Sequence, residues 1–228
     1  MRLEAWQRHT DRLAFERDLL EVPGRSDWVV EQIGSGRRVL DIGCRGGALS
    51  RLILANNNRV WGLEPNAAAA KAAQREGVLV TVGDLGSRLP FEDSFFDVVH
   101  VGESLETVFD TKEFLFECSR VLERRGSLLF SALNLNRLEN RVKMLQGKAI
   151  SEAGAFPEDH AGDRIRHFNE AKLRELCKET GWLIEACVSL PVLKSKGKWV
   201  DRSLMALARL TPGLGALLLV RARKITSS

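Results

Sequence analysis

Residues 39–49 read VLDIGCRGGAL, an apolar run of strand length that leads through a glycine-rich turn into helix-forming residues. Glycine tolerates backbone conformations that other residues avoid, so such a turn lets backbone N–H groups approach a ligand closely. The positive end of the following helix then faces negative charge. The pattern indicates a site for a ligand that carries a carboxylate, but phosphate-binding loops and plain tight turns have similar sequences.

Apolar runs and helical segments alternate along the rest of the chain. Helical patterns occupy 48–55, 67–76, 112–123 and 170–180, and runs of strand length occupy 39–42, 60–63, 79–82, 98–101, 128–131 and 184–188. Nearly continuous apolar strands favour a parallel sheet with helices on both faces. A final apolar run at 217–220, after Pro212-Gly213, is expected to add an edge strand.

Length and composition indicate a single domain that spans residues 1–228. The chain has 44% hydrophobic and 28% charged residues, and a chain of this size buries a substantial core. Charged side chains within residues 2–18 interrupt any signal-peptide core, and the apolar runs near the C-terminus are too short to span a bilayer. These features predict a cytoplasmic protein.

The cysteines form no CxxC pair and lie within apolar segments, namely Cys44, Cys118, Cys177 and Cys187. We therefore expect buried free thiols, with neither a metal site nor a disulfide framework.

Two segments depart from the alternation of strands and helices. Residues 1–35 have an amphipathic helical pattern, which predicts a lid or packing helix over the sheet. Residues 134–168 form a connection that is long for this architecture. Because open α/β sheets bind ligands at the carboxyl ends of their strands, we expect this insertion to be a substrate cap.

Acidic residues stand at two further strand tips. The second strand ends in Leu63-Glu64-Pro65, about twenty residues after the glycine turn, and the third ends in Gly83-Asp84-Leu85. An acid at the second tip is placed to accept both hydroxyls of a ribose. The three tips together predict a nucleoside-shaped site along one edge of the sheet.

With these motifs, residues 37–186 resemble the class I S-adenosylmethionine-dependent methyltransferases. The segments LPFEDSFFDVV at 89–99 and FLFECSRVL at 114–122 add to the resemblance. It implies a Rossmann-like fold with a mostly parallel seven-stranded sheet, and S-adenosyl-L-methionine as cofactor. The cofactor-binding residues that it implies are Asp41, Gly43, Cys44, Arg45, Gly47, Glu64, Pro65, Asp84 and Leu85.

Within that class the chain is most similar to the methyltransferase type 11 or MetW-like group, but it departs from the pattern. Arg45 replaces the middle glycine of the turn, Arg125-Gly126 stands where Pro-Gly-Gly is usual, and Thr107 replaces a common histidine. An arginine in the left-handed region costs about 1 kcal/mol, so Gly46 is expected to take the positive φ instead. The Arg45 guanidinium has two open interpretations, pairing with a ligand anion or pointing to solvent.

The expected reaction is methyl transfer to a small-molecule, glycan or lipid-linked acceptor, for which orientation supplies much of the rate. Glu103, just past the fourth strand, is the candidate general base. His160, Arg166 and His167, in or beside the cap, are the candidate substrate contacts. The alternative is a catalytically silent S-adenosylmethionine-binding partner protein. A nicotinamide-dependent dehydrogenase fits less well, because Asp41 precedes the glycines.

The C-terminal segment is basic, with eight Lys and Arg residues after Pro191 against the single acid Asp201. No RNA- or DNA-binding motif accompanies this charge, so nucleic acid is not an expected partner. Lysines at 194, 196 and 198 precede an apolar helical pattern at 203–210. Residues 194–210 are thus a candidate contact with an anionic membrane, although such a stripe also suits a core-facing helix. The oligomeric state is left open.

Overall fold

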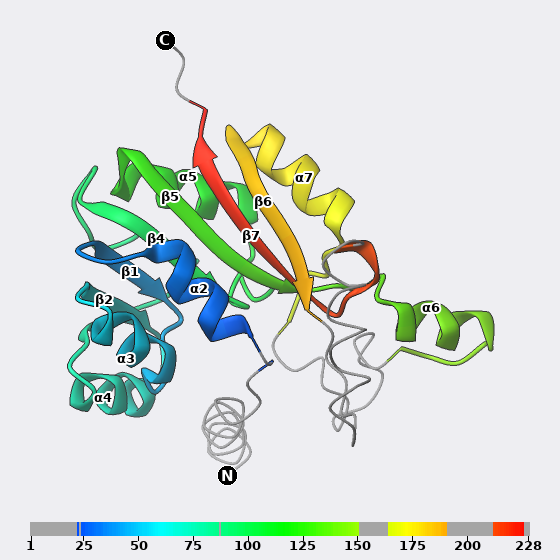
Figure 1. The fold of residues 1–228 in the computed structure, drawn as a ribbon, viewed down its shortest axis with the longest axis horizontal. Coiled ribbons are helices and arrows are strands. Elements are labelled where there is room, and N and C mark those ends of the chain that lie inside the picture. The colour runs from blue at the N-terminus through cyan, green and yellow to red at the C-terminus, as the bar shows by residue number, and fades with distance from the viewer. Residues whose placement is uncertain (1–21, 23, 87, 151–163, 191–211, 226–228) are drawn as a thin grey trace.

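The computed structural model describes residues 22, 24–86, 88–150, 164–190 and 212–225. Seven strands of these residues form one sheet in the order β3-β2-β1-β4-β5-β7-β6 (Figure 1). Strands β1 to β5 run parallel, and β7 is antiparallel to both β5 and β6. The bounds are β1 Arg38–Ile42, β2 Arg59–Glu64, β3 Leu79–Val82, β4 Phe96–Gly102, β5 Leu122–Leu133, β6 Trp182–Leu190 and β7 Leu217–Lys224. The predicted Rossmann-like, mostly parallel sheet is confirmed.

Helices cover both faces of the sheet. Their bounds are α2 Arg25–Ile33, α3 Ala48–Ala55, α4 Ala67–Arg75, α5 Thr111–Val121, α6 Leu138–Leu145 and α7 Glu170–Glu179, with a short 3₁₀ helix, η2, at Pro212–Leu214. Residues of α2, α3 and α4 pack with Val39 and Val98 on one face, and residues of α5 and α7 pack with Leu40 and Val99 on the other. This two-sided burial explains why the strands are apolar at consecutive positions.

Three of these helices begin at side-chain caps that accept backbone N–H groups of the first turn. Asn66 accepts from two such groups at the start of α4, Asp110 from two at α5, and Asn169 from one at α7. A cap satisfies donors that have no partner inside the helix, which fixes where each helix starts.

The expectation of an edge strand at 217–220 was wrong. Strand β7 lies between β5 and β6, so that β6 is at the edge. Leu217, Leu218, Leu219 and Val220 are all 0% exposed, and this continuous apolar run suits a strand with neighbours on both sides and cover on both faces. Strand β5 is also longer than predicted, because the charged residues at 123–125 continue it.

Part of the basic C-terminal segment is used inside the fold. Arg221 and Arg223 both pair with Glu185, at 3.2 Å each, and Lys224 Nζ donates to the Leu122 carbonyl at 2.5 Å. The candidate membrane segment 194–210, the core of the predicted cap at 151–163 and most of the predicted N-terminal lid lie outside the described residues. None of the described helices has the length and apolar character needed to cross a membrane.

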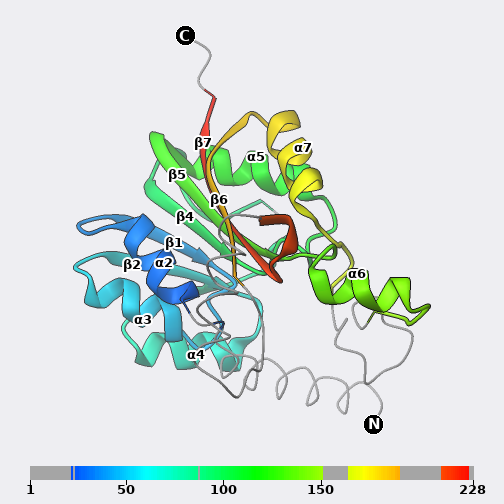
Figure 2. The ribbon, with the colours of Figure 1, turned by 45° about the vertical axis from the view of Figure 1, so that its right-hand side comes forward.

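Helix α6 belongs to the predicted cap region and projects away from the sheet beyond the carboxyl end of β5 (Figure 2). The returning segment at 164–168 pairs with the start of this region through the bridge between Asn134 and Phe168. The cap therefore begins and ends beside the carboxyl ends of the strands. Its role in substrate binding stays a prediction.

Candidate active site

The glycine-rich turn after β1 contains three residues with positive φ. These are Gly43 at 72°, Arg45 at 49° and Gly47 at 83°. The expectation that Gly46 would take the left-handed conformation was wrong, because Arg45 takes it directly. The conformation turns the Arg45 backbone N–H toward the tip of β2, where it donates to Glu64 Oε2 at 2.9 Å.

Both outer glycines of the turn are also required by contacts within the chain. A Cβ added at Gly43 would lie 2.1 Å from Ser104 Oγ, and one added at Gly47 would lie 2.8 Å from the Ala73 Cα. The Gly43 N–H donates to the Leu63 carbonyl at 2.7 Å. The turn is thus held between β2, α4 and the loop after β4.

Glu64 lies at the tip of β2, and the whole residue is 6% exposed. Its Oε1 accepts the Asn66 N–H and its Oε2 accepts the Arg45 N–H, each at 2.9 Å. Burial raises the pKa of this carboxyl, while the two N–H donors oppose that shift. A carboxylate oxygen accepts more than one hydrogen bond, so Glu64 retains acceptor capacity for ligand hydroxyls.

The other predicted cofactor residues of this half line the same edge. Asp84 follows β3 and is exposed, as is Pro65 after β2. Leu85 and Cys44 are buried, at 8% and 7% exposure. The structure places these side chains at adjacent strand tips, and their contact with a cofactor stays a prediction.

Asp41 is buried at 3% exposure and bonds to the protein itself. Its Oδ1 lies 2.7 Å from His100 Nδ1 on β4, and its Oδ2 accepts from Ser50 Oγ on α3 at 2.5 Å. A carboxylate only accepts, so this contact places a proton on Nδ1 of His100. Asp41 therefore joins β1, β4 and α3 and orients the imidazole.

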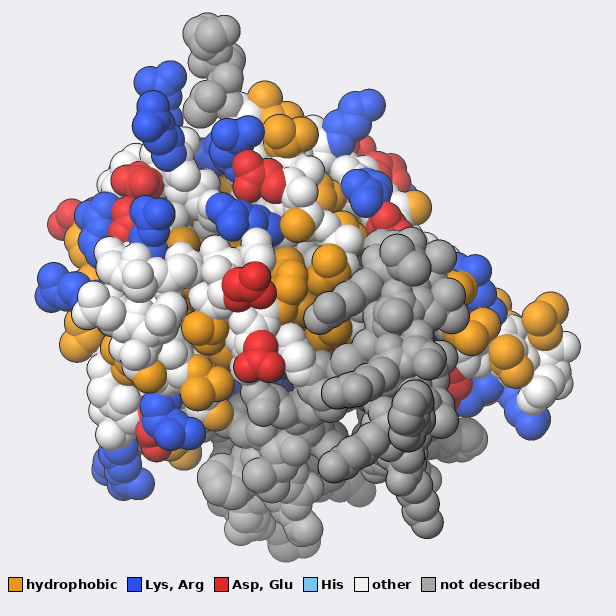
Figure 3. Space-filling view, in the orientation of Figure 1, with side chains coloured by type: hydrophobic (Ala, Val, Ile, Leu, Met, Phe, Trp, Pro, Cys, Tyr) orange, Lys and Arg blue, Asp and Glu red, His pale blue; other side chains and the backbone are white. Residues whose placement is uncertain are grey.

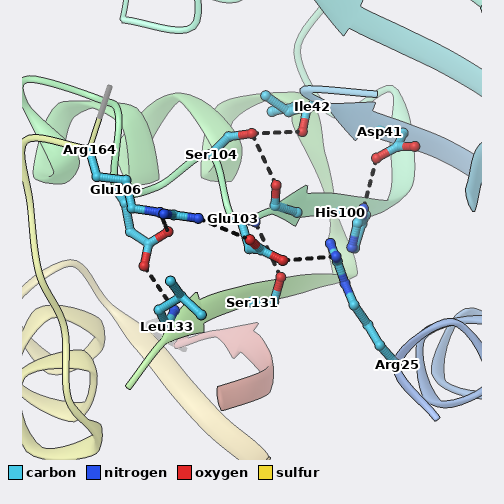
Figure 4. A network of polar contacts seen from close by, with 11 residues as sticks. Arg25, Asp41, Ile42, His100, Glu103, Ser104, Glu106, Ser131, Leu133 and Arg164 are labelled. Carbon is cyan, nitrogen blue, oxygen red and sulfur yellow. Dashed lines mark hydrogen bonds and ion pairs between the residues drawn. The ribbon is translucent and has the colours of Figure 1, made fainter. Parts of the chain in front are cut away.

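Two buried polar atoms near the end of β4 have no hydrogen-bond partner among the described residues, namely His100 Nε2 and Arg25 Nε. A Cβ added at Gly102 would lie 2.7 Å from an Arg25 Nη atom and 3.0 Å from His100 Cε1, so both side chains pack around this glycine. Figure 4 shows Arg25 reaching from α2 toward His100 and Glu103. Unpartnered buried polar atoms at a strand tip indicate that a ligand or water belongs there.

Glu103, the candidate base, lies between two guanidinium groups (Figure 4). Its Oε1 is 2.9 Å from Arg25 Nη1 and its Oε2 is 3.3 Å from Arg164 Nη2. The residue has a positive φ of 55°, and its N–H donates to the Ser131 carbonyl at 3.2 Å. The two guanidinium groups therefore occupy both oxygens of this carboxylate.

Glu106 lies beneath this pair with its side chain 1% exposed. Its Oε1 accepts the Leu133 N–H at 2.8 Å and its Oε2 accepts Arg164 Nε–H at 3.1 Å. Burial raises the pKa of Glu106 to about 7, against the opposing effect of Arg164. One guanidinium therefore bridges two carboxyl groups and ties the returning cap segment to the ends of β4 and β5.

The described residues do not bring the three predicted substrate contacts together in one site. Arg166 stacks over the ring of Phe109 at 5.5 Å and donates to that residue's carbonyl at 2.6 Å. His167 is exposed, and His160 lies outside the described residues. Thr107, in the place of the common histidine, donates to the Ser104 carbonyl at 2.8 Å.

Sequence reasoning missed Arg25, His100 and Arg164. Arg25 and Arg164 lie 78 and 61 residues from Glu103, and no local pattern marks them. The sequence of β4 contained one signal for His100. A histidine within a run of valines is a polar group that needs a hydrogen-bond partner when it is buried.

Comparison with known proteins identifies relatives of this chain among methyltransferases. A family model described as "Methyltransferase domain" matches residues 40–130. The chain is 33% identical over 124 residues to a "Ubiquinone biosynthesis O-methyltransferase" from Pseudomonas savastanoi pv. phaseolicola, over 50% of this chain and 52% of that protein. A protein of the same name from Sodalis glossinidius is 34% identical over 50% and 49% of the two chains. The chain thus spans about half the length of the curated relatives it matches.

Solved structures share the fold over nearly the whole chain. An S-adenosylmethionine-dependent methyltransferase from Thermotoga maritima, described as a possible histamine N-methyltransferase, has a TM-score of 0.68 at 19% identity, covering 94% of this chain and 97% of that one. The [4+2]-cyclase SpnF has a TM-score of 0.63 at 20% identity, covering 97% and 84%. One fold therefore supports different chemistry, and these likenesses establish architecture alone.

Proposed function

We propose that this chain transfers a methyl group from S-adenosylmethionine to a hydroxyl oxygen of a small-molecule acceptor, because residues 40–130 match a family model of methyltransferase domains. The names of the curated relatives support oxygen as the methylated atom. One observation carries the proposal. Glu64 and two buried nitrogens without a hydrogen-bond partner among the described residues, Arg25 Nε and His100 Nε2, lie along the same edge of the sheet. Together they suit a ligand with ribose hydroxyls at one end and charged groups at the other.

In this proposal the tips of β1 to β3 hold the nucleoside half of the cofactor. Glu64 accepts the ribose hydroxyls, and Asp84 accepts the adenine amino group. The turn from Gly43 to Gly47 packs its backbone against the methionine half, and Cys44, Pro65 and Leu85 complete the wall. Bound S-adenosylmethionine supplies a methyl group that is already activated by the positive charge of its sulfonium.

Arg25 and His100 then receive the amino-acid end of the cofactor. Because the contact with Asp41 places a proton on His100 Nδ1, we assign Nε2 the role of acceptor. Arg25 Nε is a donor. A donor beside an acceptor matches the carboxylate and ammonium of an α-amino acid, and this chemistry supports the fit of the described residues to the cofactor.

On the acceptor side, proximity and orientation of the two reacting groups supply most of the reduction in the activation barrier. As the acceptor oxygen takes the methyl group, the carbon–sulfur bond would break to release S-adenosylhomocysteine, and the hydroxyl proton passes to a base, which we assign to the carboxylate of Glu103. This requires Arg164 to move off Glu103 Oε2. Arg166, His160 and His167 remain the proposed acceptor contacts.

The test is incubation of the full chain with methyl-labelled S-adenosylmethionine and panels of phenols, catechols and amines, followed by mass spectrometry. The expected product is a hydroxyl acceptor heavier by one methyl group, with formation of S-adenosylhomocysteine. Transfer to amines alone would replace the oxygen assignment. Binding by calorimetry without transfer to any panel would favour the silent partner protein.

A further inference from the structure

Helix α6 carries an apolar stripe that nothing in the described structure covers. Leu138, Val142 and Leu145 are spaced four and three residues apart and so share one face of the helix. They are 47%, 44% and 88% exposed. Neighbouring Met144 is 64% exposed. Such values are unusual for four large apolar side chains within one eight-residue helix.

The stripe faces away from the body of the protein. Asn140 lies on the opposite side of the helix, is 0% exposed, and donates from Nδ2 to the Leu135 carbonyl at 2.9 Å. Arg141 fastens the helix as well, through bonds to the carbonyls of Asn136 and Gly213. Asn140 and Arg141 thus anchor the helix to the body of the protein, and Figure 3 shows orange apolar atoms and blue cationic atoms on the projecting end.

Positive charge surrounds the stripe. The segment 137–148 has four basic residues, Arg137, Arg141, Lys143 and Lys148, and one acid, Glu139. Glu139 is shared between Arg137 and Lys143. A convex helix that combines outward aliphatic side chains with net positive charge has the chemistry of a helix lying in an anionic membrane interface.

Other exposed apolar side chains lie on the same side of the molecule. Phe109 is 79% exposed and Ile165 is 49% exposed, and Arg166 stacks on Phe109. The Ile165 N–H donates to the Glu106 carbonyl, so both residues flank the carboxyl ends of the strands. Half of the large apolar side chains exposed in the described residues belong to α6 or to these two positions.

We propose that α6 docks the chain onto the surface of an anionic lipid membrane. Leu138, Val142 and Leu145 enter the interface, and Lys143 and Lys148 contact the lipid headgroups. The surface is distinct from the segment 194–210, whose membrane contact stays a separate prediction. Docking through α6 brings the carboxyl edge of the sheet, and so the proposed acceptor side, close to the membrane.

Vesicle sedimentation of the full chain tests the proposal. The vesicles are phosphatidylcholine alone or phosphatidylcholine with phosphatidylglycerol, and neither cofactor nor acceptor is added, so a failure here leaves the proposed function standing. The wild type should partition onto the anionic vesicles only. Val142→Ser with Leu145→Ser should lower the partition coefficient at least fivefold, and Lys143→Gln with Lys148→Gln should lower it and weaken its salt dependence.

Matched controls use exposed residues of the same kind elsewhere. Phe116→Ser with Leu183→Ser removes two side chains that are each 48% exposed, and Lys71→Gln with Lys178→Gln removes two exposed lysines. Both should bind like the wild type. The proposal is overturned if anionic vesicles do not bind the wild type or if the α6 variants bind unchanged. It is also overturned if lipid-free sedimentation velocity shows wild-type self-association that the apolar α6 variant abolishes.

Discussion

At the tips of β1 and β2, short-range backbone contacts hold the site, whereas at the tip of β4 charged side chains from distant segments hold it. Glu64 accepts N–H groups from Asn66 and Arg45, which are 2 and 19 residues away. Glu103 and Glu106 instead meet Arg25 and Arg164 over 58 to 78 residues. The first half of the site is therefore encoded in a local motif, and the second half forms only when the whole fold closes.

The largest expected effect lies in the second half. Arg164→Ala leaves the buried carboxylate of Glu106 without its cation, and breaking such a pair costs about 3–5 kcal/mol of unfolding free energy. Denaturant unfolding at pH 8, where Glu106 is ionised, measures it. Arg166→Ala, which removes a cation stacked on an exposed ring, should cost less than about 1 kcal/mol. Equal losses in the two variants would deny Arg164 this role.

The pH dependence of stability sharpens the same point. Burial raises the pKa of Glu106 to about 7 in the folded chain, against about 4.3 in an unfolded one. Between these values the folded state binds more protons, so unfolding free energy falls as pH rises, by up to about 1.4 kcal/mol per pH unit.

Glu106→Gln keeps the acceptor for Leu133 N–H and cannot ionise. The wild-type minus variant difference in unfolding free energy should therefore decline between pH 5 and pH 7, and flatten below pH 4 and above pH 8. Measurement of both proteins in the same buffers cancels the other titrating groups. A difference that does not change with pH would place the pKa of Glu106 near its ordinary value.

Loss of the β2 carboxylate tests the local half. Glu64→Ala should weaken binding of S-adenosylhomocysteine by about 1.5–3 kcal/mol, the range for hydrogen bonds to a charged group. It should also lower stability, because the Arg45 and Asn66 N–H groups lose their acceptor, so calorimetry must be run well below the melting temperature. Glu76→Ala, at the exposed end of α4, is the control. Unchanged affinity in Glu64→Ala would remove this residue from the site.

The smallest effect distinguishes the two ends of the cofactor. Arg25→Gln should weaken S-adenosylhomocysteine binding about tenfold, or about 1.4 kcal/mol. It should leave methylthioadenosine unchanged, since this nucleoside lacks the amino-acid end. Arg37→Gln, with a side chain on the chain segment before β1, serves as the control. A parallel loss for both ligands would assign Arg25 a structural role only.

The elements that sequence predicts well are those with strong local signals. The helix Ala48–Ala55 and the strand Leu79–Val82 have the predicted bounds, because a turn or a cap stands at their ends. The length of strand β5 was underestimated, because the strand includes the charged residues Glu123, Arg124 and Arg125. For the site, Glu64 was predictable from its spacing, whereas Arg25 and Arg164 depend on packing between elements that no single-sequence pattern connects.

The position of β7 has a consequence for how the chain is made. Strand β7, the last of the described strands along the chain, is an inner strand of the sheet, with seven register pairs to β5 and eight to β6. A ribosome releases these residues after the other described strands, so until then β6 lacks the strand that it pairs with in the described sheet. Until then β5 and β6 both present open edges that invite pairing with other chains. Residues 217–224 therefore close both edges when they are synthesised, and this pairing removes the risk of aggregation through these two edges of β5 and β6.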